Sequence, residues 1–90
     1  MLLRVAIGKQ LRDIRIEQNR SLREVSSTAQ VAVGYLSEVE RGQKEISSEL
    51  LSAIALALGV NVSLIINNAA SFMAWQELKE RQAKADEIAA

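Results

Sequence analysis

Basic side chains are the residues of this sequence with the clearest chemical use, and they are unevenly placed. Residues 1–44 hold eight basic and five acidic side chains, a net charge of +3, and the remaining residues carry −3, so the 90-residue chain is neutral. A locally basic surface attracts phosphate groups even when the whole chain has no net charge. Nucleic-acid binding is one interpretation of this asymmetry. Charge alone favours the simpler one, in which these side chains lie on solvated helix faces.

Catalytic chemistry has little support in the sequence. The chain contains no histidine and no cysteine, so it lacks an imidazole base, a thiolate and the usual ligands of zinc, copper and iron–sulfur clusters. Its serines have no base within the chain to activate them. We therefore expect no enzyme activity, no catalytic residue, no metal site and no cofactor, and no small-molecule ligand is evident.

The elements that must position the basic residues are helices. Apolar residues recur at spacings of three and four, which is typical of helices with one buried face. The Ser21-x-x-Glu24 pattern is a capping box, Gly42 supplies a helix stop and Ser47 is a good N-cap. The predicted helices span residues 3–19, 22–29, 33–41 and 48–58, with a last one from 62 to about 85.

The last segment admits a second interpretation. Residues 60–66 are rich in β-branched side chains, which favours a strand. We prefer a helix, because an apolar seam continues at helical spacing from Val62 to Gln76.

The cellular setting follows from composition. The apolar run between Leu50 and Gln76 is interrupted by serine, asparagine and glycine, so a membrane span is a poor interpretation. The first residues are too short and too charged a segment for a secretory leader. We therefore expect a cytoplasmic protein with no membrane partner.

The second and third predicted helices, with the turn Gln30–Ala32 between them, have the spacing of a helix-turn-helix. The sequence of Tyr35–Gly42, Tyr-Leu-Ser-Glu-Val-Glu-Arg-Gly, resembles the recognition-helix signature of the phage-repressor-like regulators, the Cro/CI or XRE family. The resemblance extends from about Ile7 to Leu64. It implies an all-α, lambda-repressor-like fold: a compact bundle of about five helices, with a DNA-binding domain at residues 1–61 and a C-terminal helical extension at residues 62–90.

The resemblance implies a sequence-specific transcriptional regulator that binds double-stranded DNA. Carried over from the family, the residues that reach base edges are Val33, Gly34, Ser37 and Glu38. Those implied to contact the DNA backbone are Arg23, Tyr35, Arg41, Gln43 and Lys44. For Glu38 an alternative stays open, in which its carboxylate pairs with Arg41 instead of reading a base.

The resemblance also implies a largely buried ion pair between Arg15 and Glu40 that bridges the first and third helices. The sequence departs from the family pattern at three positions. Gln30 stands where a glycine usually makes the turn, and a left-handed backbone there costs about 1 kcal/mol. Ala32 replaces a capping Ser or Thr, and Leu22 replaces a Gln that in many members touches a phosphate.

The C-terminal helix is expected to form a homodimer, because a chain this short has nothing left to cover both faces of that helix. The predicted interface consists of Ile65, Ala69, Phe72, Met73, Trp75 and Leu78. A two-fold dimer reads a palindromic operator with one recognition helix in each half-site. In the alternative, Phe72 and Trp75 fold back onto the Leu51–Leu58 stripe of their own chain.

A second function also fits a small helical bundle: a protein-interaction module, such as an antitoxin or a sequestering subunit. Four residues separate the two hypotheses, because a DNA-binding protein needs them outward on one face. They are Arg23, Tyr35, Arg41 and Lys44. The residues encode neither the operator nor the direction of regulation.

Overall fold

The computed structural model describes residues 1–89, and over that range it contains helices and no strand. The helices are α1 (Leu3–Glu17), α2 (Leu22–Ala29), α3 (Val33–Glu40), α4 (Ser48–Leu58) and α5 (Val62–Ala89). The all-α prediction is confirmed. The predicted bounds lie close to the observed ones, except that α5 continues to Ala89.

Capping residues define the helix ends, as the sequence predicts. The Ser21 hydroxyl accepts from the Glu24 N–H at 3.1 Å, and the Glu24 carboxylate accepts from the Ser21 N–H at 3.1 Å. Ser47 caps α4 by accepting from the Leu50 N–H at 3.2 Å. These bonds satisfy N–H groups that have no partner within a helix.

The strand alternative for residues 60–66 is wrong, because α5 begins at Val62. The strand preference of the β-branched residues did not determine the structure of this segment. Packing of the segment against the core determined it. Ile65 and Ala69 are fully buried, and they lie on the face of α5 that meets α1. An apolar face with a helical period can be buried in this way only as a helix.

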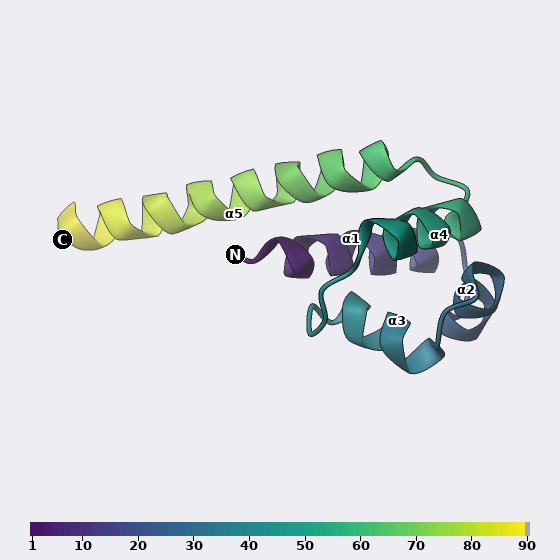
Figure 1. Ribbon diagram of the computed structural model, residues 1–90. Coiled ribbons are helices and arrows are strands. Elements are labelled where there is room, and N and C mark those ends of the chain that lie inside the picture. Colours follow the sequence, from purple (N-terminus) through teal and green to yellow (C-terminus); the bar gives the residue numbers. More distant parts are fainter. Residues whose placement is uncertain (90) are drawn as a thin grey trace.

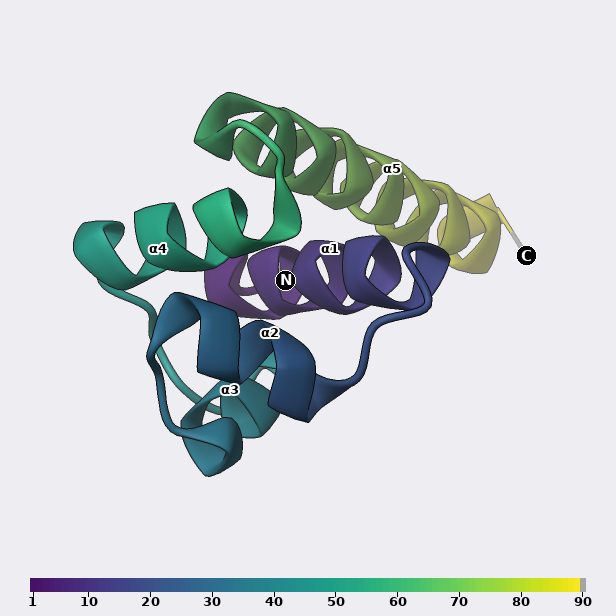
Figure 2. The same cartoon turned by 90° about the vertical axis from the view of Figure 1, so that its right-hand side faces the viewer.

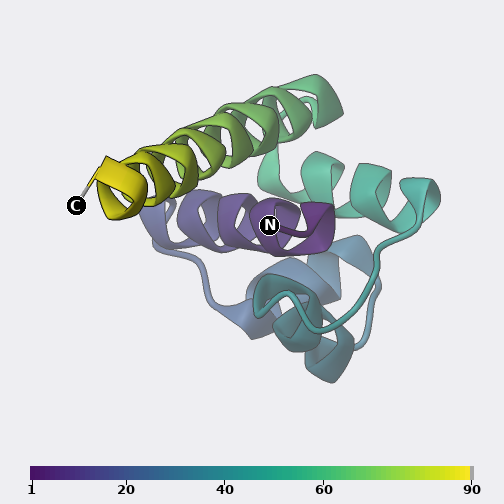
Figure 3. The ribbon, with the colours of Figure 1, turned by 90° about the vertical axis from the view of Figure 1, so that its left-hand side faces the viewer.

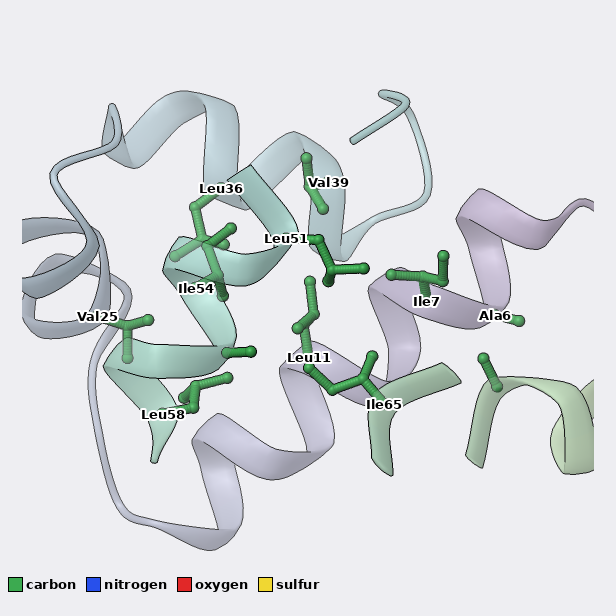
Figure 4. Packing of buried hydrophobic residues seen from close by; sticks show 12 residues of the cluster. Ala6, Ile7, Leu11, Val25, Leu36, Val39, Leu51, Ile54, Leu58 and Ile65 are labelled. Carbon is green, nitrogen blue, oxygen red and sulfur yellow. The ribbon is translucent and has the colours of Figure 1, made fainter. Parts of the chain in front are cut away.

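Helix α1 lies in the middle of the bundle. In all three views α5 runs along one side of α1, and α2 and α3 lie on the opposite side (Figures 1, 2 and 3). Helix α4 packs against α2 and α5 and closes the bundle. Every helix contributes to the single core shown in Figure 4, which consists of Ala6, Ile7, Leu11, Val25, Leu36, Val39, Leu51, Ile54, Ala55, Leu58, Ile65 and Ala69.

Two glycines allow α1 and α3 to meet closely. A Cβ at Gly8 would lie 2.2 Å from the carbonyl oxygen of Val39, so the two backbones touch there. After α3, Gly42 has a φ of +73°, and a Cβ at this position would lie 2.9 Å from the Val5 side chain. Because no larger residue fits at either point, α1 determines where α3 lies.

Two residues predicted for the dimer interface lie instead in the core of their own chain. Ile65 and Ala69 have no exposed surface, because the first half of α5 covers α1. For these two the prediction is wrong: an apolar seam shows that a helix face is covered, but not which chain covers it. Phe72 and Met73 are half-buried against the same core, and the Lys9 ammonium lies 5.0 Å from the centre of the Phe72 ring. Phe72 therefore folds back on its own chain, next to α1.

The second half of α5 leaves the bundle. Every side chain from Glu77 to Ala89 is exposed, and the last turns extend past the amino end of α1 (Figure 1). The molecule is consequently elongated, 52 Å by 24 Å by 23 Å. Residues on both sides of the predicted boundary between 61 and 62 share one core, and the division into 1–61 and 62–90 stays a prediction.

No single helix within residues 1–89 is long and apolar enough to cross a membrane. Helices α4 and α5 together have the length and composition for it, with a bend of 104° at the break between them. The apolar residues Leu51, Ile54 and Leu58 of α4 are buried in the core.

Candidate nucleic-acid interface

A sharp turn joins α2 to α3 and gives the helix pair its geometry. Gln30 ends α2 in the left-handed conformation, with φ 59° and ψ 44°, although it carries a side chain. The N–H of Val31 donates to the Ser26 carbonyl oxygen at 3.0 Å, which closes the turn. Ala32 starts α3 with no side-chain cap, as its residue type predicts. The turn therefore forms without the usual glycine, at a cost of about 1 kcal/mol.

One side of α3 is buried and the other faces outward. Leu36, Val39 and Glu40 point into the bundle. The four residues predicted to reach base edges lie on the outer side: Val33 and Gly34 are exposed, and Ser37 and Glu38 are half-buried. A Cβ at Gly34 would meet no atom within 4 Å, so the backbone is open to close approach from outside.

Polar side chains at the end of α3 bind one another. The Arg41 guanidinium donates to the Ser37 hydroxyl and, at 3.4 Å, to the amide oxygen of Gln43. The expected alternative partner, Glu38, makes no ion pair within the part of the chain that the structure describes. The Glu38 carboxylate is thus available on the outer side of α3.

The remaining residues predicted to contact the DNA backbone come from α2, from α3 and from the loop after α3. Arg23, Gln43 and Lys44 are exposed, and Arg23 lies in the first turn of α2. Tyr35 is half-buried and differs from them, because its hydroxyl donates to the Glu45 carbonyl oxygen at 3.0 Å. The hydroxyl proton of Tyr35 is therefore donated within the chain, and the bond holds the loop after α3 in place.

Arg4 also supports this loop, and sequence reasoning missed it. Its Nε donates to the Gly42 carbonyl oxygen at 3.1 Å, and its Nη1 pairs with Glu45 Oε1 at 2.9 Å. The ion pair places a cation beside the one carboxylate of the loop, next to Lys44. No local pattern could have indicated this, because Arg4 lies at the other end of α1 from the predicted ion pair.

The predicted ion pair between Arg15 and Glu40 is present. Arg15 Nε lies 2.8 Å from Glu40 Oε2, and Arg15 Nη2 lies 2.9 Å from Glu40 Oε1. The side chains are 13% and 5% exposed, respectively. Arg15 also donates to the Arg20 carbonyl oxygen at 2.9 Å, and its hydrogen bonds to Glu40 raise the pKa of the guanidinium. The pair joins α1 to α3, and so orients the outer face of α3.

Together these residues form a surface with exposed basic side chains around an outward-facing helix. Such a surface can place a helix in a DNA groove and bind the phosphates on either side of it. Residues 1–89 contain no group of three or more His, Cys, Asp or Glu side chains placed to hold a metal ion.

A family model described as "Helix-turn-helix" matches residues 11–65 of this chain. The match includes α2, the turn and α3 in full. It also includes Arg15 and Glu40, and the start of α5 that completes the core.

Individual relatives agree with this match. The chain is 54% identical over 76 residues to the "Transcriptional regulator ClgR" of Mycobacterium tuberculosis, an alignment that covers 84% of this chain and 68% of the relative. It superposes on the crystal structure of "the clp gene regulator ClgR from Corynebacterium glutamicum" with a TM-score of 0.92 and 43% identity, covering 100% of this chain and 96% of that one. The restriction-modification controller protein C.AhdI from Aeromonas hydrophila gives a TM-score of 0.67 and 26% identity, covering 69% and 94%.

The detailed sequence of Gly34–Leu51 points the same way. Glu-Arg-Gly-Gln-Lys-Glu followed by Ser-Ser-Glu-Leu-Leu is similar to the actinobacterial Clp protease gene regulator ClgR, and the comparisons confirm that resemblance. The chain belongs to the XRE-type helix-turn-helix family.

Proposed function

We propose that this chain is a sequence-specific DNA-binding regulator that activates Clp protease genes, and that it binds a palindromic operator as a homodimer. The observation that carries the proposal is the outer face of α3, which is open and bordered by exposed basic side chains. The similarity of the chain to regulators named for clp genes indicates Clp protease genes as the target of regulation. An enzymatic role is not part of the proposal.

In the proposed complex with DNA, α3 enters the major groove, and four residues meet the base edges. The Val33 side chain packs on a thymine methyl group, and the Glu38 carboxylate accepts from a cytosine N4 amine. Gly34 lets the backbone approach the bases, since nothing occupies the space where its Cβ would be. Ser37 presents a hydroxyl that Arg41 already orients.

Affinity comes from the phosphates on either side of the groove. Arg23, Arg41 and Lys44 supply positive charge, and Gln43 supplies an amide, all of them exposed. Tyr35 contributes by holding the loop that carries Gln43 and Lys44. Because the whole chain is neutral, this local charge must account for the attraction to DNA.

The homodimer uses the exposed side of α5. Trp75 and Leu78 are both 57% exposed and lie about one turn apart on the helix. Leu64, also exposed, falls on the same side, because eleven residues make about three turns. A second copy would cover these side chains and bring two α3 helices to half-sites about 34 Å apart.

Selection of bound sequences from random duplex DNA tests the proposal. We expect a palindromic motif that also occurs upstream of clp genes in the genome of origin. The matched control is the same selection with Arg41→Ala/Lys44→Ala, which removes two exposed charges from the proposed surface. Recovery of no motif with the parent chain would refute the proposal and favour a protein-interaction module.

A further inference from the structure

The loop after α3, residues 41–47, is held by the first turn of α1. Arg4 Nε donates to the Gly42 carbonyl oxygen at 3.1 Å, and Arg4 Nη1 lies 2.9 Å from Glu45 Oε1. The next residue of α1 touches the same loop, because a Cβ at Gly42 would lie 2.9 Å from the Val5 side chain. The position of the loop therefore depends on residues that lie outside the proposed DNA-contacting surface.

Two opposite charges follow one another in this loop. Lys44 supplies one of the proposed phosphate contacts, and Glu45, the one acidic residue of the loop, comes directly after it. The Glu45 side chain is 78% exposed. A carboxylate beside a phosphate contact repels the phosphate and competes with it for the ammonium group of Lys44. Binding of DNA at Lys44 is therefore weakened unless another cation holds Glu45.

The backbone of Glu45 is also fixed in place. The Tyr35 hydroxyl donates to the Glu45 carbonyl oxygen at 3.0 Å. The carboxylate thus extends from a fixed point beside Lys44. Loss of its cation alone would leave the negative charge in this position.

Arg4 is the cation that holds Glu45. Within residues 1–89 Glu45 pairs with Arg4, and Lys44 makes no ion pair. The Arg4 side chain is 34% exposed, and its bond to the Gly42 carbonyl oxygen directs the guanidinium toward the loop. We propose that Arg4 is a positioning residue for DNA binding, which holds the Glu45 carboxylate and so leaves the Lys44 ammonium free to bind a phosphate. The inference rests on the proposed function, and Arg4 itself contacts no phosphate.

Two variants isolate the charge of Glu45. Arg4→Ala and Arg4→Ala/Glu45→Gln lack the same bond to the Gly42 carbonyl oxygen, and they differ in whether position 45 is charged. Coulomb's law in water gives about a fivefold change in affinity for one unit charge at contact distance from another. Arg4→Ala should therefore bind the selected operator about fivefold more weakly than the parent at low salt, and the double variant should regain most of that loss. Equal affinities of the two variants would overturn the inference.

The single variant Glu45→Gln completes a double-mutant cycle. Because Arg4 already holds the carboxylate in the parent, Glu45→Gln should change the affinity less there than it does in the Arg4→Ala background. The same gain in both backgrounds would show that Arg4 does not control Glu45, and would overturn the inference.

The salt slope, which is the slope of log K against log salt, separates positioning from direct contact. Each neutralised phosphate contributes about 0.9 to it. The double variant should have the slope of the parent, because Lys44 still neutralises its phosphate. A slope lower by about one for the double variant would show that Arg4 itself binds a phosphate, and would overturn the positioning role.

Melting temperatures separate the effect on DNA binding from an effect on the fold. An exposed ion pair contributes little to stability, so Arg4→Ala and the double variant should melt at nearly the same temperature. If the double variant melted well above Arg4→Ala, its tighter binding would reflect stability, and the inference would be overturned.

Lys9→Ala is the matched control, because Lys9 also pairs with a carboxylate, Asp13, on α1. Lys9 lies next to Phe72 of α5, and α5 lies on the opposite side of α1 from α3 (Figure 2). This variant should bind the operator as the parent does. A fivefold loss here as well would show that any cation on α1 attracts DNA, and would overturn the role of Arg4. A parent that binds no duplex DNA would instead refute the proposed function itself.

Discussion

Arg15 and Glu40 form a two-point ion pair, with N···O distances of 2.8 and 2.9 Å, between the central helix α1 and the outward-facing helix α3. The pair lies next to the point where Gly8 lets the two backbones touch. Orientation of α3 thus depends on a charged contact and a steric one, both made with the same helix. A substitution that disrupts either contact would move the whole proposed base-reading surface.

Replacement of Glu40 by alanine should destabilise the fold by about 3–5 kcal/mol, because Arg15 would keep its charge in a largely buried position without a partner. Thermal or urea unfolding measures the loss. Glu38→Ala is the matched control: it removes a carboxylate two residues away that makes no ion pair, and should change stability by less than about 0.5 kcal/mol. Equal stabilities for the two variants would contradict the structural role of the pair.

Replacement of Lys44 by alanine should weaken binding to all DNA sequences nearly equally. A phosphate contact carries no base information, and its loss should lower the salt slope by about one. Titrations of specific and random duplexes at several salt concentrations measure both effects. A variant that lost affinity for the operator but not for random DNA would show instead that Lys44 reads bases.

Replacement of Glu38 by glutamine should change base preference at one position of each half-site. Glutamine keeps the size of the side chain but replaces a pure acceptor by an amide, and the expected discrimination is about 1–3 kcal/mol. Selection of bound sequences with the parent and the variant measures it. Identical motifs would exclude Glu38 from base recognition.

Acid should weaken the start of α2. The hydrogen bonds from the Ser21 N–H and hydroxyl lower the pKa of Glu24. A carboxylate whose pKa is lower in the folded than in the unfolded chain stabilises the fold above its unfolded pKa. It loses that effect as the pH falls below the unfolded pKa and through the lower folded value. Glu24→Gln keeps the acceptor but does not titrate.

The melting temperatures of the parent and of Glu24→Gln should therefore converge as the pH falls from about 6 to about 3. A constant difference over this range would mean that the Glu24 charge does not contribute to the cap.

The helix boundaries could be predicted because their causes are local. Ser21, Glu24 and Ser47 bond to backbone N–H groups three residues away, and such pairs are visible in a sequence. The pair of Arg15 with Glu40 was predictable only through the family resemblance. Contacts of Arg4 with the loop after α3 were not predictable at all, because they join segments about forty residues apart, which only the packing of α1 against α3 brings together.

The site itself was predicted as a set of residues but not as a surface. The family resemblance selected Val33, Gly34, Ser37 and Glu38, the sequence pattern predicted the helix that carries them, and a helical period is enough to put them on one side. The side of α5 that packs against α1 could not be predicted from the helical period. Ile65 and Ala69 meet α1, and Trp75 lies about a quarter-turn around the helix from that face, a difference set by the packing of the whole bundle.

The exposed side of α5, which does not meet α1, provides the residues for a test of the dimer. Phe72 packs next to α1, so its truncation would disturb the monomer, whereas Trp75 and Leu78 are exposed in the single chain. If a second copy covers them, Trp75→Ala/Leu78→Ala removes side chains whose loss at an interface centre costs about 2 kcal/mol or more each. The double variant should sediment as a monomer at micromolar concentration. It should bind the palindromic operator far more weakly than the parent. Its melting temperature should fall only by the stabilisation that dimer formation gives the parent at high concentration.

Leu56→Ala provides the matched control for this variant, because Leu56 is an apolar residue that is 82% exposed and lies on a different helix, α4. We expect this variant to remain dimeric and to bind DNA as the parent does. If Leu56→Ala became monomeric while the α5 variant stayed dimeric, the interface would lie on α4. A monomeric α5 variant that bound the operator as tightly as the parent would show that one recognition helix suffices, and that the two-fold arrangement is not how this protein recognises its site.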